Sequence, residues 1–268
     1  MKTHLSDLSW PEVRELLTKP HAILIPVGST EQHGLHLPLS VDSACAAYLS
    51  EQAAQKVGSE NDITVVVAPT LHYGRVVAFA GFPGSIGISL DTATQLIADI
   101  ASSLVKQGFK NIIFVNGHAE NIVPISAGLS QVSSDFPGAG LYAVDWLALG
   151  FETIPKIRKS KAGLHADELE TSLSLVIQPE NVRMEKAVKE TPEFSLSGKW
   201  VNPDIYGPNR MLYHSRVKFP RMGTGNGVMG DPTVASRETG EKVAAAVIKD
   251  LAEIIVEIVR SEKLVHKT

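Results

Sequence analysis

The sequence predicts an α/β fold in which a mostly parallel sheet is covered by helices on both faces. Two observations lead to this prediction: short apolar runs rich in β-branched residues, and helix-length segments that alternate with them. A run that is apolar at every position suits a strand buried on both faces, and strand–helix alternation is typical of parallel sheets. The 268 residues can build a sizeable core, and we expect one domain, 1–268.

Four apolar runs are expected to form the strands, and each is followed by turn residues. They cover residues 22–27, 63–68, 112–115 and 141–144. Helices are expected between and after them, at residues 42–57, 91–107, 121–133 and 233 to about 263. Asp42 is expected to cap the first of these helices, and Asp231 with Pro232 to begin the last.

Residues 191–229 interrupt this alternation. They contain Pro192, Pro203, Pro208 and Pro220, several glycines, and the aromatic residues Trp200, Tyr206 and Tyr213. Two interpretations are open. The segment is either a long surface excursion or a loop that covers a pocket or contacts a neighbouring subunit, because long loops in compact domains often act as lids.

Composition excludes several classes of protein. Hydrophobic residues make up 44% of the chain and charged residues 20%, which excludes a disordered or fibrous protein. With a net charge of −4, the chain has no basic surplus for nucleic acid, and no apolar run is long enough to span a membrane. The N-terminus lacks a signal pattern, so we expect a cytoplasmic protein. A single cysteine, Cys45, excludes an intrachain disulfide and a cysteine-rich zinc site.

A first polar cluster follows the first predicted strand. Glu31 and His33 are two residues apart, so in extended backbone they project to the same side. Asp42 is expected at the mouth of the next helix, and open α/β sheets bind ligands at this edge. Carboxylates and an imidazole at a strand end are a credible metal site. His36, in the same segment, is expected to be a structural histidine.

A second cluster follows the third predicted strand, where His118 and Glu120 repeat the two-residue spacing. Two strand ends with a His/Glu pair each would supply two nitrogen and two oxygen ligands, and Asp42 could bridge. Glu31, Asp42, Glu120 and one hydroxide would balance two divalent ions in charge. Such a site lowers the pKa of bound water toward ~7.

A third cluster opens the segment 165–172. Asp167 and Glu168 precede an apolar stretch and suit a helix start, where the helix dipole favours acidic residues. His165 lies just before that helix, and Glu170 follows five residues later, expected to face the same pocket. A histidine that is free of metal could move protons.

Together these segments resemble the creatininase family of metal-dependent amidohydrolases. The resemblance is carried by SWPEV at 9–13, PVGSTEQHGLHLPLSVD at 26–42, FPG at 82–84, NGHAEN at 116–121, HADELETS at 165–172 with Pro179 behind it, and GDPT at 230–233. Each piece is short. Their order along nearly the whole chain makes the resemblance highly specific.

The resemblance implies a metal centre with two ions, most often zinc or manganese and in some relatives iron. One ion would be held by Glu31, Asp42 and His118, and the other by His33, Asp42 and Glu120, with Asp42 as the bridge. His165 matches the family's acid/base histidine, and Glu170 matches the glutamate of its ETS motif. The implied fold is a three-layer α/β/α sandwich, and the implied assembly is a homo-oligomer, a hexamer in creatininase itself.

The chain departs from the family pattern at the expected substrate wall. It reads RVVAFAGFPG after Tyr73-Gly74, where relatives commonly have a serine and then a histidine before FPG, so Arg75, Val76 and Phe79 change that wall. Ala119 replaces a tyrosine of creatininase, and Asp167 replaces a common glycine. The family also includes a deformylase of a pyrimidine nucleotide intermediate, a peptidase of a cofactor precursor peptide, and a hydrolase of a keto-inositol.

We therefore expect a dinuclear metal hydrolase that cleaves the C–N amide bond of a small, non-peptide and cyclic substrate, without nucleic-acid or membrane partners. His165 would deliver a proton to the leaving nitrogen, since expulsion of an amide anion is prohibitive near neutral pH. Two alternatives remain. The substrate could be that of another relative, or the protein could bind metal without turnover.

Overall fold

The computed structural model describes residues 2–161, 163–190, 193–194, 204, 217–218 and 225–265. Its centre is a four-stranded sheet, β1 (His21–Val27), β2 (Thr64–Val67), β3 (Asn111–Asn116) and β4 (Gly140–Asp145), in the order β2-β1-β3-β4. Every pair in this sheet is parallel. Each strand lies within two residues of its predicted position, so the strand predictions are confirmed.

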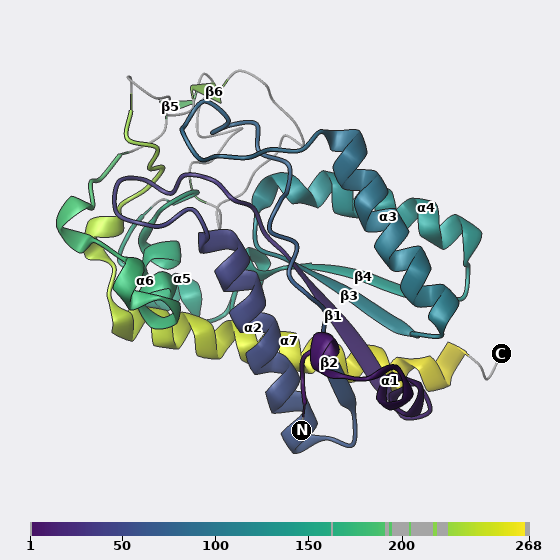
Figure 1. The fold of residues 1–268 in the computed structure, drawn as a ribbon. Coiled ribbons are helices and arrows are strands. Elements are labelled where there is room, and N and C mark those ends of the chain that lie inside the picture. The colour runs from purple at the N-terminus through teal and green to yellow at the C-terminus, as the bar shows by residue number, and fades with distance from the viewer. Residues whose placement is uncertain are drawn as a thin grey trace.

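Helices cover the sheet on both sides (Figure 1). They are α1 (Trp10–Leu16), α2 (Val41–Glu60), α3 (Leu90–Gln107), α4 (Ile122–Asp135), α5 (Ile154–Ile157), α6 (Glu168–Ile177) and α7 (Arg237–Val265). Short 3-10 turns occupy Leu5–Asp7, Ala119–Asn121, Trp146–Ala148, Pro179–Asn181, Met184–Lys186 and Pro232–Val234. A separate antiparallel pair joins β5 (Glu193–Phe194) to β6 (Val217–Lys218).

Two hydrophobic cores hold the layers together, because successive strand residues point to opposite faces. Leu24 and Ile113 belong to the core shared with α2, α6 and α7. Ile23 and Phe114 belong to the core shared with α1, α3 and α4. All seven residues of β1 are buried, as its apolar sequence predicts. The predicted α/β/α sandwich is confirmed.

Two helix starts differ from the prediction. Asp42 does not cap α2: the cap position is Ser40, and Asp42 lies in the first turn with its side chain turned toward the strand ends. The last helix begins at Arg237 and not near residue 233, because Ala235 is extended and Ser236 accepts the N–H of Thr239. Asp231 caps only the preceding 3-10 turn, through the N–H of Thr233.

Most of the predicted excursion at 191–229 lies outside the described residues, and its two interpretations stay open. Asp204, a described residue within it, forms an ion pair with Arg158. At its end, Met229 pairs with His165 in an isolated bridge. Within the part of the chain that the structure describes, every helix is too short or too polar to cross a membrane.

Candidate metal centre

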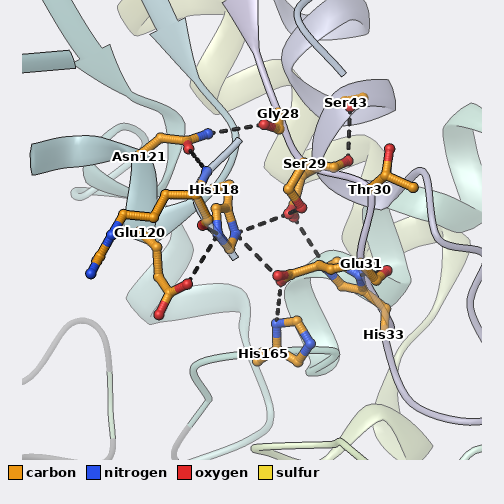
Figure 2. A network of polar contacts seen from close by, with 12 residues as sticks. Gly28, Ser29, Thr30, Glu31, His33, Ser43, His118, Glu120, Asn121 and His165 are labelled. Carbon is orange, nitrogen blue, oxygen red and sulfur yellow. Dashed lines mark hydrogen bonds and ion pairs between the residues drawn. The ribbon is translucent and has the colours of Figure 1, made fainter. Parts of the chain in front are cut away.

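The polar clusters meet at the carboxyl ends of β1 and β3. In the sheet, β2 lies on one side of β1 and β3 lies on the other. The chain changes direction across the sheet between β1 and β3, so the ends of these two strands flank the point of reversal. Such a reversal leaves a crevice where α/β proteins bind ligands. Glu31 and His33 follow β1, His118 follows β3, and Asp42 comes from the first turn of α2. Figure 2 shows the side chains of Glu31, His33 and His118 converging.

Two glycines allow α2 to begin directly on these strand ends. A Cβ at Gly28 would lie 2.4 Å from the backbone of Ser43, and one at Gly117 would lie 2.3 Å from the backbone oxygen of Asp42. Both are closer than real Cβ contacts. The Asn-Gly sequence after β3 therefore serves close packing as well as the turn, and it brings Asp42 into the site.

Asp42 connects the two histidines that lie on either side of it. Its Oδ1 is 3.1 Å from Nε2 of His33, and its Oδ2 is 3.1 Å from Nδ1 of His118. Ser29 donates its hydroxyl to Oδ2 at 2.6 Å. The carboxylate is thus held with one oxygen toward each histidine, which is the arrangement of a bridging ligand.

The outer nitrogens of both histidines are fixed by backbone carbonyls. Nδ1 of His33 is 3.1 Å from the backbone oxygen of Glu31, and Nε2 of His118 is 2.8 Å from that of Arg75. A carbonyl oxygen only accepts, so these nitrogens carry the hydrogens and, in the neutral rings, the inner nitrogens offer lone pairs to Asp42. Lone pairs that face carboxylate oxygens need a proton or a metal cation between them, and metal-ligating histidines are commonly oriented in this way.

Glu31 provides an independent indication of a cation. Its side chain is completely buried, and neither carboxylate oxygen has a hydrogen-bond partner among the described residues. Its Oε1 lies 3.4 Å from Nδ1 of His118 and 3.6 Å from Nδ1 of His165 (Figure 2). A buried carboxylate without donors is costly unless an ion neutralises it. The residues present therefore fit a divalent metal.

Three groups of ligand atoms lie close enough to share an ion. They are Glu31 with Asp42 and His118, His33 with Asp42 and Glu170, and Glu31 with His33 and His165, each within 4.8 Å. The first is the set that the resemblance implies for one metal. In the second, the carboxylate beside His33 and Asp42 is Glu170, at the position where the resemblance implies Glu120.

Glu120 lies on the other side of His118. Its Oε2 is 3.8 Å from Nε2 of His118, and its oxygens accept the N–H groups of Val77 at 2.6 Å and Ala78 at 3.3 Å. Burial alone would raise the pKa of Glu120, but His118 and these N–H groups hold it below the ordinary value. Glu120 is therefore ionised near neutral pH.

Burial and neighbouring charges shift the pKa values of the central groups. Burial raises the pKa of Glu31. Burial alone would lower the pKa of His33, but the carboxylate of Asp42 raises it to about 10. Burial works against ionisation of Asp42 too, yet His33 and His118 hold its pKa below the usual range. Burial and the nearby His33 lower the pKa of His165 well below its ordinary value, so this ring is neutral at pH 7.

His165 is held by one segment of backbone and two rings. Its Nε2 is 2.8 Å from the backbone oxygen and 3.0 Å from the side-chain nitrogen of Gln32. Phe79 stacks on the imidazole, with ring centroids 4.0 Å apart, and His33 lies 4.3 Å away. His36, in contrast, is turned away to Thr171 and belongs to none of the three ligand groups.

Glu170 folds back to the backbone of Ala166, the left-handed residue that follows His165. Ala166 has φ of 49°, and its N–H donates to Oε2 of Glu170 at 2.5 Å. Asp167 caps α6 through the N–H groups of Leu169 and Glu170, as the acidic helix start predicts. Burial raises the pKa of Glu170, whose Oε2 lies 3.8 Å from His33.

Several supporting side chains were not expected from the sequence. Asn121 accepts the N–H of Arg75 and donates to the oxygen of Gly28, so it joins three segments of the site. Asn116 donates to the backbone oxygen of His118. Both asparagines stand inside the NGHAEN motif. Their roles could have been suspected from the sequence, because the two asparagines flank the metal-ligand candidate His118.

The site opens into a cavity of about 230 Å³. Its lining includes apolar residues from five segments of the chain. The carboxylates and imidazoles that line it are Glu31, Asp42, His118, Glu120, His165 and Glu170. A substrate in this cavity would contact both kinds of surface.

Comparisons with known proteins identify the family. The creatininase family model, described as creatinine amidohydrolase, matches residues 6–255. The chain is 30% identical over 259 residues to the mycofactocin precursor peptide peptidase of Mycolicibacterium smegmatis, which covers 93% of this chain and 90% of the relative. It is also 26% identical over 275 residues to 3-dehydro-scyllo-inosose hydrolase of Thermotoga maritima. That alignment covers 95% of this chain and 83% of the relative.

A solved structure shares the fold of this chain. The solved structure "Creatininase Mn" superposes with a TM-score of 0.78 at 22% sequence identity, covering 96% of this chain and 98% of that chain. The matching motifs, the nearly complete coverage and the shared sandwich fold agree, and the protein belongs to the creatininase family of hydrolases.

Proposed function

We propose that the protein is a hydrolase with two divalent metal ions, zinc or manganese, that cleaves the C–N bond of an amide. The observation that carries this proposal is the buried carboxylate of Glu31, whose oxygens have no donor among the described residues and face histidine nitrogens. Carboxylate and imidazole ligands suit either metal. The match to a creatininase structure named for manganese supports the same choice.

We propose that Glu31, Asp42 and His118 hold one ion and that His33 and Asp42 hold the second. The distances favour Glu170 as the further carboxylate at the second ion, in place of Glu120. The bound ions would supply a Lewis acid for the substrate carbonyl and lower the pKa of water toward neutrality.

The remaining groups are then available for proton transfer. Glu120 lines the cavity and is ionised near neutral pH, so it can accept the proton of the attacking water. His165 also lines the cavity, and because its ring is neutral at pH 7 it would first take up that proton and then pass it to the leaving nitrogen. Proton delivery is required because amide nitrogen leaves only after protonation. Asn121 and Gln32 would position the groups that carry out these transfers.

The substrate that we propose is a small amide, in the first place a cyclic one. A turnover screen of the metal-loaded protein over lactams, cyclic ureas, formamides and short peptides tests it. Hydrolysis of a lactam or cyclic urea, lost in Glu31→Gln together with the metal, is the expected result. If the loaded protein hydrolyses none of these classes, the proposed chemistry is wrong.

A second candidate is hydrolysis of a peptide bond. It is favoured by the 30% identity to a precursor peptide peptidase, which extends over 93% of the chain. The proposed groups would act on a peptide bond in the same way, since it is also an amide. Cleavage of short peptides without cleavage of lactams would select this candidate.

A further inference from the structure

A small apolar cluster lies directly beside the charged site. Val76, Phe79 and Met229 are buried in it, with Ala78, Phe82 and Leu164 packed around them. It is separate from both cores of the sandwich. Four of its residues come from the loop between β2 and α3, while Leu164 and Met229 come from segments joined by a backbone hydrogen bond.

Part of this cluster forms a wall of the cavity. The apolar lining residues are Ala78, Phe79, Ala119, Leu147, Leu164 and Met229, and Gly117 completes them. Among the described lining residues, every titratable side chain belongs to the polar clusters already assigned to metal binding and proton transfer. The cavity therefore has a strongly polar and an apolar part of its lining, and the described apolar side chains offer a charged group no partner.

The apolar wall lies next to His165. Phe79 stacks on the imidazole at 4.0 Å with the ring planes 20° apart, and Leu164 precedes His165 in the chain. Met229 donates its backbone N–H to the oxygen of His165 at 2.8 Å. If His165 serves the leaving nitrogen, the group attached to that nitrogen lies against these side chains.

We infer that this wall is a specificity subsite for an uncharged, apolar substituent on the leaving nitrogen of the substrate amide. The inference rests on the proposed function, because the proposed role of His165 decides where in the cavity the leaving nitrogen lies. An aliphatic or aromatic group would exchange water for Phe79, Leu164 and Met229, whereas a charged group would lose its hydration there. Hydrophobic pockets discriminate by about 10–200-fold for each methylene.

Four acetamides that share the acyl group test the subsite. They are N-benzylacetamide, N-methylacetamide, N-acetylglycine and N-(2-aminoethyl)acetamide. We expect kcat/KM for the benzyl compound to exceed the values for the other three by at least about tenfold. The affinity of each compound for the zinc-loaded protein, measured by ligand-observed NMR, should follow the same order. This second readout does not depend on turnover.

Three variants identify the wall. Leu164→Lys places a cation on it and should reverse the preference in favour of N-acetylglycine. Phe79→Leu should reduce the advantage of the benzyl compound by about tenfold. The matched control is Phe82→Leu, because Phe82 packs against Phe79 in the same cluster at 6.2 Å but does not line the cavity. The control should keep the wild-type order, and metal content and circular dichroism establish that each variant is folded.

The two proposals fail in different ways. Equal affinity for the benzyl and the charged compounds, or a preference that Leu164→Lys leaves unchanged, would overturn the subsite even if amides are hydrolysed. Selective binding of the benzyl compound without hydrolysis of any amide would instead contradict the proposed function and support the subsite.

Discussion

Asp42 is the residue on which both halves of the metal centre depend. One carboxylate oxygen faces His33 and the other faces His118, and Ser29 holds the second oxygen in place. The acidic residue at the start of a helix suggests a cap, but the closeness of α2 to the strand ends turns its side chain inward. A helix start is thereby used as a ligand position.

The first prediction concerns this bridge. Asp42→Ala should remove both metal ions, because each proposed ligand set loses a member. His33→Ala, the matched comparison, should deplete chiefly one ion, since His33 contacts only one side of Asp42. Metal analysis after dialysis measures both. Full occupancy in Asp42→Ala would show that Asp42 does not bridge.

The second prediction concerns His165. If His165 moves protons and does not bind metal, His165→Ala should keep both ions while turnover falls by about 10²–10⁴. Substrates with a good leaving group should lose less, since they need less protonation. Metal analysis and kinetics on one preparation decide the point. His165 lies within ligand distance of Glu31 and His33, so a parallel loss of metal would make it a ligand instead.

At the scale of elements, the strand ends and the start of α2 form the site only because glycine allows them to touch. The contact is closest at Gly117, where the missing side chain leaves room for the backbone oxygen of Asp42 and the Cβ of Ala46. Neither neighbour can move without displacing the first turns of α2. The packing of this helix and the geometry of the metal centre are therefore linked.

The third prediction tests that link. Gly117→Ala should lower the free energy of unfolding by about 1–3 kcal/mol, the usual cost of overpacking, and weaken metal affinity as Asp42 moves. Gly138→Ala is the control, because a Cβ there has no neighbour within 4 Å. Chemical denaturation and metal competition against a chelator measure the two effects. Unchanged metal affinity in a destabilised Gly117→Ala protein would separate packing from the site.

The same elements show what could be read from the sequence. The strands were predictable because β1 and β3 are buried at every position, and burial on both faces leaves an unbroken apolar run. The clustering of His118 with Glu31 followed from parallel strands ending at one edge. The spacing also predicted that Glu170 shares the pocket of His165, and both line the cavity. Its position beside His33 and Asp42 was not predicted, and no periodicity signals the left-handed residue Ala166 that precedes it.

Exposed apolar side chains bear on the molecule as a whole. Tyr73, Val77 and Ile86 on the loop before α3, and Ile122 and Val123 at the start of α4, are each about half exposed, between 47% and 56%. Exposed apolar side chains that gather into a patch mark interaction surfaces. They are the kind of surface that an oligomer would cover.

The fourth prediction is that the protein forms a closed homo-oligomer, a hexamer by its family resemblance. Light scattering coupled to size exclusion at micromolar concentration measures the mass. Val123→Asp should shift the assembly toward smaller species, because it places a charge at one of these exposed apolar positions. A wild-type monomer with full hydrolytic activity would contradict the prediction.

The final prediction concerns proton linkage across the whole metal centre. In the metal-free protein, the carboxylate of Asp42 outweighs burial and keeps His33 protonated up to a pKa of about 10, and the pKa of His118 is raised as well. A metal ligand must be deprotonated, so metal binding near pH 7 has to expel these protons. Affinity should therefore rise as the pH is raised from 6 to 9, where the competing protons are lost more easily.

The pH range of the effect distinguishes this centre from one held by ordinary carboxylates alone, whose affinity would level off once those acids are ionised. Calorimetric titrations of the chelator-treated protein with Zn²⁺, in two buffers of different ionisation enthalpy, count the protons released. We expect net release of protons at pH 7.

Metal binding should also raise the melting temperature. A ligand that binds only the folded protein at 1,000 times its Kd adds about 4 kcal/mol to stability. Binding without proton release would mean that neither histidine ligates the ion.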